Sequence, residues 1–194
     1  KTADYLEGSQ FEDFRGSSTK FFQNDTGIPV CQALINRTPK KKTLRGLHTQ
    51  LGKMAEEKII HCISGELVWF AINYSDYTNT GAITTKELRL ISGQTIYVPK
   101  HHLNGMISLS DGVSILILAS RPFDQEAGIN VSPFDGLFFG EILNDFGVDK
   151  ARFDQKSGMV SQHTFLKTLT SNTDWNSNWV ISIVNQTPLE LEQF

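Results

Sequence analysis

The feature that most constrains the fold is a series of short apolar runs that recur between Lys58 and Ser120. The runs are rich in isoleucine, valine and aromatic residues, and Gly, Asn, Asp, Ser or Pro separate them at a spacing of about ten residues. They read KIIHCI, ELVWFAINY, ELRLI, TIYVP, GMISL and VSILILAS. This spacing is typical of a sandwich or barrel and leaves no room for a helix between consecutive strands. We therefore predict a mostly β fold.

The pattern changes after the last of these runs. Residues 128 to 133 are expected to form a loop, and GEILNDFGVDKARF and TFLKTL then show a mixed, helix-like spacing. NWVISIV offers one more strand near the end. We expect residues 1–135 to form the β-barrel and residues 136–194 to form a short mixed α/β tail packed on the barrel within the same domain.

Composition narrows the class of partner and the compartment. A chain of 194 residues with a net charge of −3 has no excess of basic charge to bind nucleic acid or an anionic membrane. Cys31 and Cys62 are too few to staple the fold or to build a zinc site, so we expect free thiols. No apolar run approaches 18 residues and no signal-peptide pattern opens the sequence, so a cytoplasmic protein is expected.

A lone histidine, His48, lies in the stretch LRGLHTQ. Three roles are open: a hydrogen-bonded structural residue, an acid–base catalyst, or a metal ligand. Metal ligation is disfavoured because the i+2 position, where a barrel would present a second ligand, holds Gln50, and Asn104 stands where a third histidine would be needed. His101 and His102 are adjacent and so point to opposite faces of a strand. We expect no bound metal.

A lysine, Lys58, shares a strand face with apolar neighbours. In the alternation of Lys58, Ile60 and Cys62 the lysine is turned inward if that face is buried. A buried ammonium needs an anionic partner. A transient enolate or a substrate phosphate would serve, and so would Glu56 or Glu57.

The segments FEDFRG, LRGLHTQ, EEKIIHCISGEL and IYVPKHHLNGMISLSD, in this order and spacing, resemble the dTDP-4-dehydrorhamnose 3,5-epimerase family of cupins over residues 11 to 135. The resemblance implies a cupin-type β-jelly roll that forms homodimers by exchanging an N-terminal strand. It also implies an isomerase of deoxysugar biosynthesis that needs no metal or organic cofactor. Its substrate would be a nucleotide-diphosphate 4-keto-6-deoxy sugar, epimerised at carbons next to the ketone.

The same resemblance assigns roles to individual residues. His48 is the base that removes a proton beside the ketone, and Lys58 stabilises the enolate. Arg45 and Arg15 contact the substrate or its diphosphate, with Arg15 supplied by the partner subunit. Three further positions are expected to contact substrate: Gln50, Asn36 and Asn104.

The chain also departs from the family pattern. The tyrosine that acts as acid in the family is replaced by Ile117, and a later tyrosine by Phe123. The carboxylate that orients the base histidine has no counterpart that the sequence identifies. Tyr97 and Cys62 are considered as replacement acids, although each is expected to serve packing.

Three outcomes follow from the missing phenol: epimerisation of a single carbon, another enolisation such as 3,4-ketoisomerisation, or nucleotide-sugar binding without catalysis. We favour epimerisation because His48, Lys58 and Arg45 are all present together. A binding protein would have no use for an inward lysine, which an apolar residue could replace at lower cost.

Overall fold

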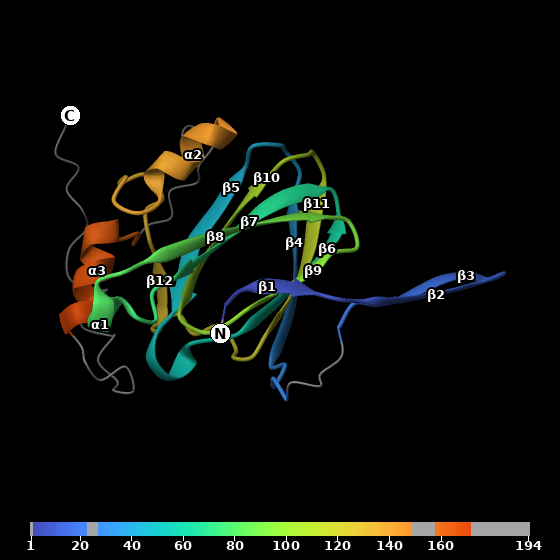
Figure 1. Ribbon diagram of the computed structural model, residues 1–194, viewed down its shortest axis with the longest axis horizontal. Coiled ribbons are helices and arrows are strands. Elements are labelled where there is room, and N and C mark those ends of the chain that lie inside the picture. The colour runs from blue at the N-terminus through green and yellow to red at the C-terminus, as the bar shows by residue number, and fades with distance from the viewer. Residues whose placement is uncertain (1, 23–26, 149–157, 172–194) are drawn as a thin grey trace.

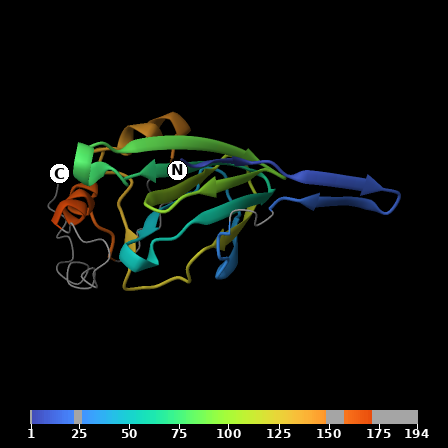
Figure 2. The same ribbon diagram turned by 60° about the horizontal axis from the view of Figure 1, so that its bottom comes forward.

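The computed structural model describes residues 2–22, 27–148 and 158–171. Two five-stranded sheets with antiparallel pairing lie face to face (Figures 1 and 2). The first sheet has the order β1-β9-β6-β11-β4, with bounds Asp4–Leu6, Thr95–Val98, Lys58–Ser64, Val113–Ala119 and Gln32–Thr38. The second has the order β12-β5-β10-β7-β8, with bounds Gly128–Asn130, Leu44–Gln50, His102–Ser108, Glu66–Asn73 and Thr84–Ile91. The predicted mostly β fold is confirmed.

Each apolar run of the sequence forms a strand of one of these two sheets, from β6 to β11. Glycines with positive φ close the turns between them, as at Gly65, Gly93 and Gly112. Side chains from both inner faces form a core between the sheets, which includes Ile60, Trp69 and Ile115. The inner faces are therefore packed over most of the barrel.

The two sheets differ in how their outer faces are covered. Strand β7 is apolar along nearly its whole length because both of its faces are buried, with Trp69 inward and Phe70 outward. Strand β4 alternates instead, with half-buried inward residues and exposed outward ones such as Ile35. The outer face of the second sheet is covered, whereas the outer face of the first sheet is partly open to solvent.

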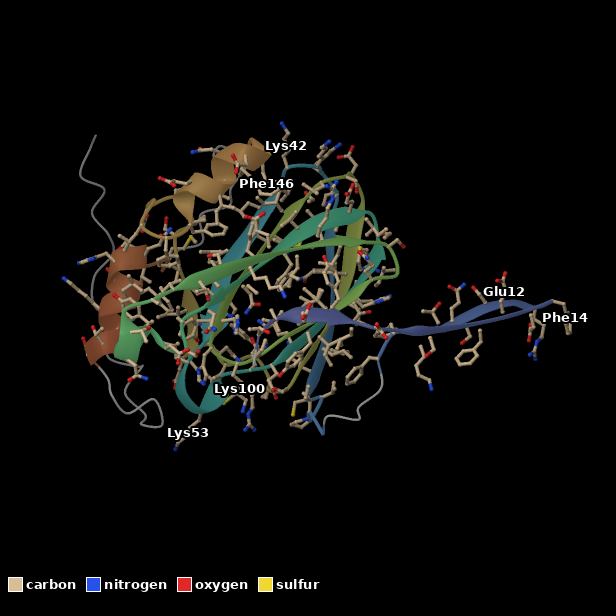
Figure 3. The ribbon with its side chains drawn as sticks, in the orientation of Figure 1. Glu12, Phe14, Lys42, Lys53, Lys100 and Phe146 are labelled. Carbon is tan, nitrogen blue, oxygen red and sulfur yellow. The ribbon has the colours of Figure 1, made fainter. Side chains whose placement is uncertain are left out.

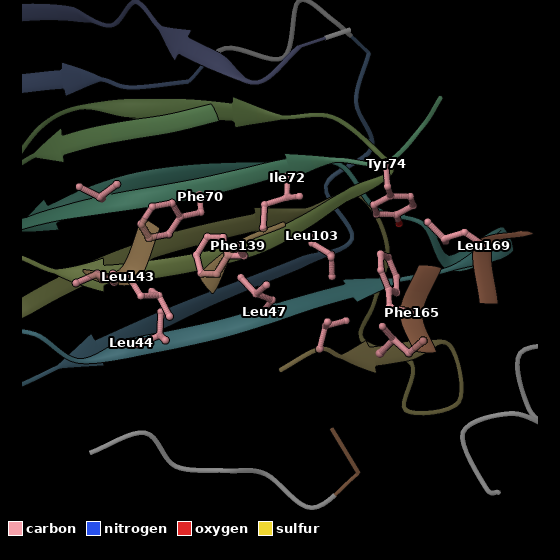
Figure 4. Packing of buried hydrophobic residues seen from close by; sticks show 14 of the residues in the cluster. Leu44, Leu47, Phe70, Ile72, Tyr74, Leu103, Phe139, Leu143, Phe165 and Leu169 are labelled. Atoms are coloured by element: carbon pink, nitrogen blue, oxygen red, sulfur yellow. The ribbon is translucent and has the colours of Figure 1, made fainter. Parts of the chain in front are cut away.

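The cover on the second sheet comes from the segment that follows the barrel. Helices α2 (Gly140–Phe146) and α3 (Gln162–Ser171) contribute apolar side chains to a second core on this face (Figure 4). Phe70 meets Phe139 edge to face at 4.9 Å between ring centroids, and Tyr74 meets Phe165 at 5.3 Å. A short helix, α1 (Tyr77–Thr80), lies beside α3. None of the described helices is both long and apolar enough to cross a bilayer.

The N-terminal segment leaves the body of the protein. After β1, strands β2 (Ser9–Asp13) and β3 (Gly16–Lys20) form a two-stranded hairpin whose residues are all exposed. Figures 1 to 3 show that it projects far beyond the barrel, with Phe14 near its tip. Phe14 is 98% exposed, so the hairpin makes little use of its own subunit for support.

Two expectations about the second part of the chain need adjustment. The loop expected at residues 128 to 133 was wrong in part, because Gly128–Asn130 forms β12 and pairs with β5. The strand is difficult to recognise in the sequence because it is only three residues long. The expected helices are present as α2 and α3, while the expected strand NWVISIV and the end of the GEILNDFGVDKARF stretch lie outside the described residues.

Candidate functional site

The stretch LRGLHTQ forms β5, and Gly46 sets the direction of its side chains. Leu44 and Leu47 both point to the outer core of the second sheet, so the alternation is interrupted between them. Arg45 and His48 consequently both face the barrel interior, opposite Met106 and Asn104 of β10. A Cβ on Gly46 would lie 2.5 Å from the backbone oxygen of Asn104, so no other residue fits there.

His48 lies among polar and aromatic side chains at one end of the barrel. Its Nδ1 is 3.2 Å from Oδ1 of Asn130, the residue directly opposite on β12. Its ring is 6.0 Å from that of Phe123, which is 61% exposed, so the site opens to solvent beside this ring. A Cβ on Gly128 would lie 3.3 Å from Cε1 of His48, and the glycine thus leaves room for the imidazole.

Lys58 is the first residue of β6 and faces the interior from the opposite sheet, at the same end as His48. Its Nζ lies 2.7 Å from Oε1 of Glu56, and the two side chains are 11% and 9% exposed. Of the partners considered from the sequence, Glu56 is the one that the structure pairs with it. Glu57 instead accepts a hydrogen bond of 2.6 Å from the hydroxyl of Tyr97.

Arg45 is exposed and Asn36 is half-buried, and both lie away from the end of the barrel that holds Lys58. The Arg45 guanidinium donates to Oγ1 of Thr38 at 3.0 Å and to the carbonyl of Arg37 at 3.2 Å, which directs it along β4. Asn36 pairs with Ile115, a residue of the inner core, and so points inward. Arg37 and Thr38 pair with Ser114 and Val113, so the Arg45 guanidinium lies at the end of β11 opposite to Ala119, the residue that pairs with Lys58.

Gln50 and Asn104 are occupied by contacts within the protein. Gln50 is 1% exposed; its amide donates to the carbonyls of Met54 and Pro122, and its oxygen accepts from the Asp124 amide at 2.6 Å. It thereby joins the loop that follows β5 to the loop between β11 and β12. Asn104 accepts from Nε1 of Trp69 at 3.2 Å and donates to the carbonyl of His102 at 2.9 Å. Contact of either residue with a substrate stays a prediction.

The position expected to hold a tyrosine is apolar and buried. Ile117 belongs to the inner core and is 6% exposed. Tyr97 is paired with Ile59 on the outward side of β9 and cannot face the interior as a replacement acid. Cys62 does point inward, but burial raises the pKa of its thiol to about 11, and it donates to the carbonyls of Ser64 and Gly65. Both residues therefore serve the structure of the barrel.

Arg15 is not brought together with the other predicted site residues within one chain. It lies at the turn of the projecting hairpin, paired with Asp13, with 76% of its side chain exposed. Figure 3 shows how far the hairpin tip lies from Lys53 and Lys100, which mark the end of the barrel that holds His48.

A cavity of about 720 Å³ opens at that same end. Its lining comes from the loops that follow β5, β7, β9 and β11, and includes Lys53, Lys100, His101 and Arg121. No acidic residue lines it, and within the described ranges the side chains of Lys53, Lys100 and Arg121 donate no hydrogen bond and form no ion pair. The cavity thus carries positive charge, and His48 and Lys58 are not among its lining residues. Nowhere in the described part of the chain do three or more His, Cys, Asp or Glu side chains form a group that could hold a metal ion.

Sequence reasoning missed Asn130. The residue lies between Ile129 and Val131, which both point to the outer core, so the alternation in GINVS marks Asn130 as inward-facing. This signal is short, and it becomes informative once β12 is known to pair with β5.

The comparison with known proteins decides the family. A family model described as dTDP-4-dehydrorhamnose 3,5-epimerase matches residues 3–170. The chain belongs to this family. The resemblance carried by RGLHTQ and its neighbouring motifs is therefore confirmed, and the match extends through α3.

Individual members of the family are distant. The dTDP-4-dehydrorhamnose 3,5-epimerase of Escherichia coli K12 is 29% identical over 106 residues, which is 54% of this chain and 56% of that protein. The match thus spans little more than half of the relative's length. Among solved structures, the dTDP-4-dehydrorhamnose 3,5-epimerase of Elizabethkingia anophelis has a TM-score of 0.62 at 23% identity, covering 84% of this chain and 88% of that one. A 3'-monoepimerase from Streptomyces bikiniensis in complex with dTDP-quinovose has a TM-score of 0.61 at 19% identity, covering 84% and 80%. These likenesses confirm the predicted jelly-roll fold.

Proposed function

We propose that the protein is an isomerase that epimerises a nucleotide-diphosphate 4-keto-6-deoxy hexose at a carbon next to the ketone. The observation that carries the proposal is the placement of His48 and Lys58 on facing sheets at one end of a barrel of this family. A C–H beside a ketone is weakly acidic, so its removal needs a positioned base and a donor for the developing enolate oxygen. His48 supplies the base and Lys58 the donor.

The electrostatics of the barrel mouth support an anionic substrate. The cavity at this end is lined by Lys53, Lys100 and Arg121 with no opposing carboxylate, and a cleft of one sign attracts a ligand of the other. Relatives with solved structures were crystallised with dTDP or dTDP-sugars. A nucleotide diphosphate fits this charge distribution.

The isoleucine at position 117 leaves the reprotonation step without a phenol as proton donor. With no phenol at that position, the proton returns to the enolate from water or from the imidazolium of His48. Return from water on the opposite face inverts the carbon. We therefore propose that the enzyme epimerises one carbon, since an acid dedicated to a second carbon is not provided by Ile117.

We also propose that the active unit is a cytoplasmic homodimer. The outer face of the first sheet exposes Ile35 and Ile63 at 47% and 42%, whereas α2 and α3 cover the corresponding face of the second sheet. The hairpin of residues 9–20 projects from the same first sheet through β1, with Arg15 at its turn. A second copy that packs on this face would bury the exposed isoleucines and the hairpin. Each subunit would then receive Arg15 from its partner.

The experiment that tests the activity is proton NMR in D₂O with purified protein and freshly generated 4-keto-6-deoxyglucose linked to dTDP, CDP or GDP. Protein-dependent loss of the H3 or the H5 signal is expected. The rate of this loss should be about 10² to 10⁴-fold lower in His48→Ala. His163→Ala, which removes an exposed histidine on α3, is the matched control and should exchange at the wild-type rate. Ketone migration would also remove H3, and ¹³C NMR of the product distinguishes it by a ketone carbon at C3 in place of C4. If neither signal decays with any of the three substrates, the proposal fails.

A further inference from the structure

We propose that Asn130 is the positioning residue for His48, holding its ring by a neutral hydrogen bond so that Nε2 is the atom that accepts the substrate proton. The catalytic meaning of this contact rests on the function proposed above. The contact itself does not, and it is measurable in the protein without substrate.

The geometry fixes which ring nitrogen carries hydrogen. Asn130 and His48 are directly opposite in the β12–β5 ladder, so their side chains leave the sheet on the same face. Oδ1 of Asn130 lies 3.2 Å from Nδ1 of His48. An amide oxygen can only accept a hydrogen bond, so Nδ1 must donate. In a neutral imidazole the lone pair then belongs to Nε2.

Asn130 is itself held from two sides, which makes it suited to this task. On one side β12 pairs with β5, and the amide of Val131 continues this pairing by donating to the carbonyl of Leu47 at 2.9 Å. On the other side the amide of Val160 donates to the carbonyl of Asn130 at 2.9 Å, and Ser132 donates to the carbonyl of Val160 at 2.8 Å. Val160, which precedes α3, thus holds β12 in place, and β12 in turn holds Asn130 against His48.

The neutral amide has a consequence that a carboxylate in its place would not have. A carboxylate both orients an imidazole and attracts the proton that the ring takes up, whereas a carboxamide orients it without adding charge. The charged and titratable groups around His48 come from its own strand, from the strands and loop packed against it, and from the facing sheet. Among the described residues, these groups include Arg45, His102, Asp124, Lys58 and Glu56.

Two of these groups already have partners that limit their influence on the ring. Oδ1 of Asp124 accepts from the amides of Glu126 and Ala127, and Glu56 is paired with Lys58. A carboxylate placed at residue 130 would therefore be a new negative charge in direct contact with Nδ1. This makes Asn130→Asp an isosteric substitution with a large expected effect on the titration of His48.

The test is to follow the ring nitrogens of His48 by ¹⁵N NMR across pH in ligand-free protein. Wild type, Asn130→Asp and Asn130→Leu are compared, with Asn79→Asp on exposed α1 as the control for net charge. We expect the wild-type ring to carry its hydrogen on Nδ1. In Asn130→Asp the titration midpoint should rise by about one pH unit or more over wild type, whereas Asn79→Asp should leave it unchanged. Asn130→Leu should give a mixture of the two neutral tautomers.

The same variants are then assayed for solvent exchange into the keto sugar. The acid limb of the pH–rate profile should move upward with the midpoint in Asn130→Asp, and Asn130→Leu should lower the rate by about 10-fold or more with KM unchanged. A wild-type ring with hydrogen on Nε2, or a midpoint that Asn130→Asp does not move, would overturn the inference. If the NMR results agree but no variant exchanges any proton, the positioning contact stands and the proposed activity is what fails.

Discussion

At the scale of single residues, the ion pair of Lys58 with Glu56 is expected to affect both the stability of the fold and the proposed reaction. Both side chains are about nine-tenths buried, so Lys58→Met leaves an unpartnered carboxylate in the barrel. Loss of one member of a buried pair costs about 3–5 kcal/mol. We expect Lys58→Met to lower the unfolding free energy by about that amount and to abolish enolisation.

The double variant Lys58→Met/Glu56→Gln separates these two effects. The carboxamide carries no charge, so most of the lost stability should return, as measured by urea unfolding. Solvent exchange at the sugar carbon should not return, because the donor to the enolate oxygen is still missing. Recovery of exchange in the double variant would show that Lys58 does not stabilise the enolate.

A second residue, His102, links stability to pH. Burial lowers the pKa of His102 below the ordinary value of 6.5, and Nδ1 lies 3.0 Å from the carbonyl of Lys100. The folded protein therefore stays unprotonated at this ring to lower pH than the unfolded chain does. As the pH falls through about 6.5, the unfolded chain binds the extra proton first, and stability is lost.

We expect the melting temperature to fall by several degrees between pH 7 and pH 5, and to fall less in His102→Asn, which titrates at neither pH. His163→Asn removes an exposed histidine on α3 and should keep the wild-type pH dependence. Equal slopes in wild type and His102→Asn would contradict the assignment, and scanning calorimetry at fixed ionic strength measures both.

At the scale of elements, α3 acts as part of the wall behind the site. Phe165 is fully buried, with its ring edge to face with that of Tyr74 on the outer face of the second sheet. Phe165→Ala should lower the unfolding free energy by about 3–5 kcal/mol because it leaves a cavity that this face cannot close. Lys167→Ala, on the exposed side of the same helix, should change it by less than about 0.5 kcal/mol. Similar unfolding curves for the two variants would mean that α3 is not anchored there.

The elements also show what the sequence could predict. Strands β6 to β11 follow from the apolar runs because each run packs on at least one sheet face and a turn residue follows it. Strand β12 did not, because its three residues depend on β5 on one side and Val160 on the other. The same difference separates the site residues. His48 and Lys58 lie in recognisable local motifs. The short alternation in GINVS indicates that Asn130 faces inward, but not that it lies opposite His48, which follows from the pairing of β12 with β5.

At the scale of the whole molecule, the proposed exchange of the hairpin makes each site depend on two chains. Mixing His48→Ala and Arg15→Ala subunits tests this directly. If Arg15 acts across the dimer, a mixed dimer has one site with both defects and one site with neither. Equal mixing should then restore about a quarter of wild-type exchange from two nearly inactive proteins. No recovery, with mixed dimers shown by native mass spectrometry, would place Arg15 in its own subunit's site, whereas wild-type exchange by Arg15→Ala alone would place it outside any site.

We further propose that the barrel and the segment after residue 135 form one domain, because the outer core of the second sheet draws side chains from both. Removal of that segment would expose Phe70, Tyr74 and their neighbours and would release β12 from Val160. Unfolding followed by near-ultraviolet circular dichroism and by far-ultraviolet circular dichroism should therefore give one coincident transition.

The projecting hairpin has a consequence for the protein at low concentration. Strands β2 and β3 pair with each other and are exposed along their whole length, and a lone two-stranded ribbon is marginally stable in water. In the proposed dimer, a neighbouring copy would add most of the protection of its backbone amides from deuterium uptake. If the proposed dimer forms, dilution should raise deuterium uptake in this hairpin while the barrel amides keep their protection, and the uptake of the hairpin would then measure the fraction of protein that is dimeric.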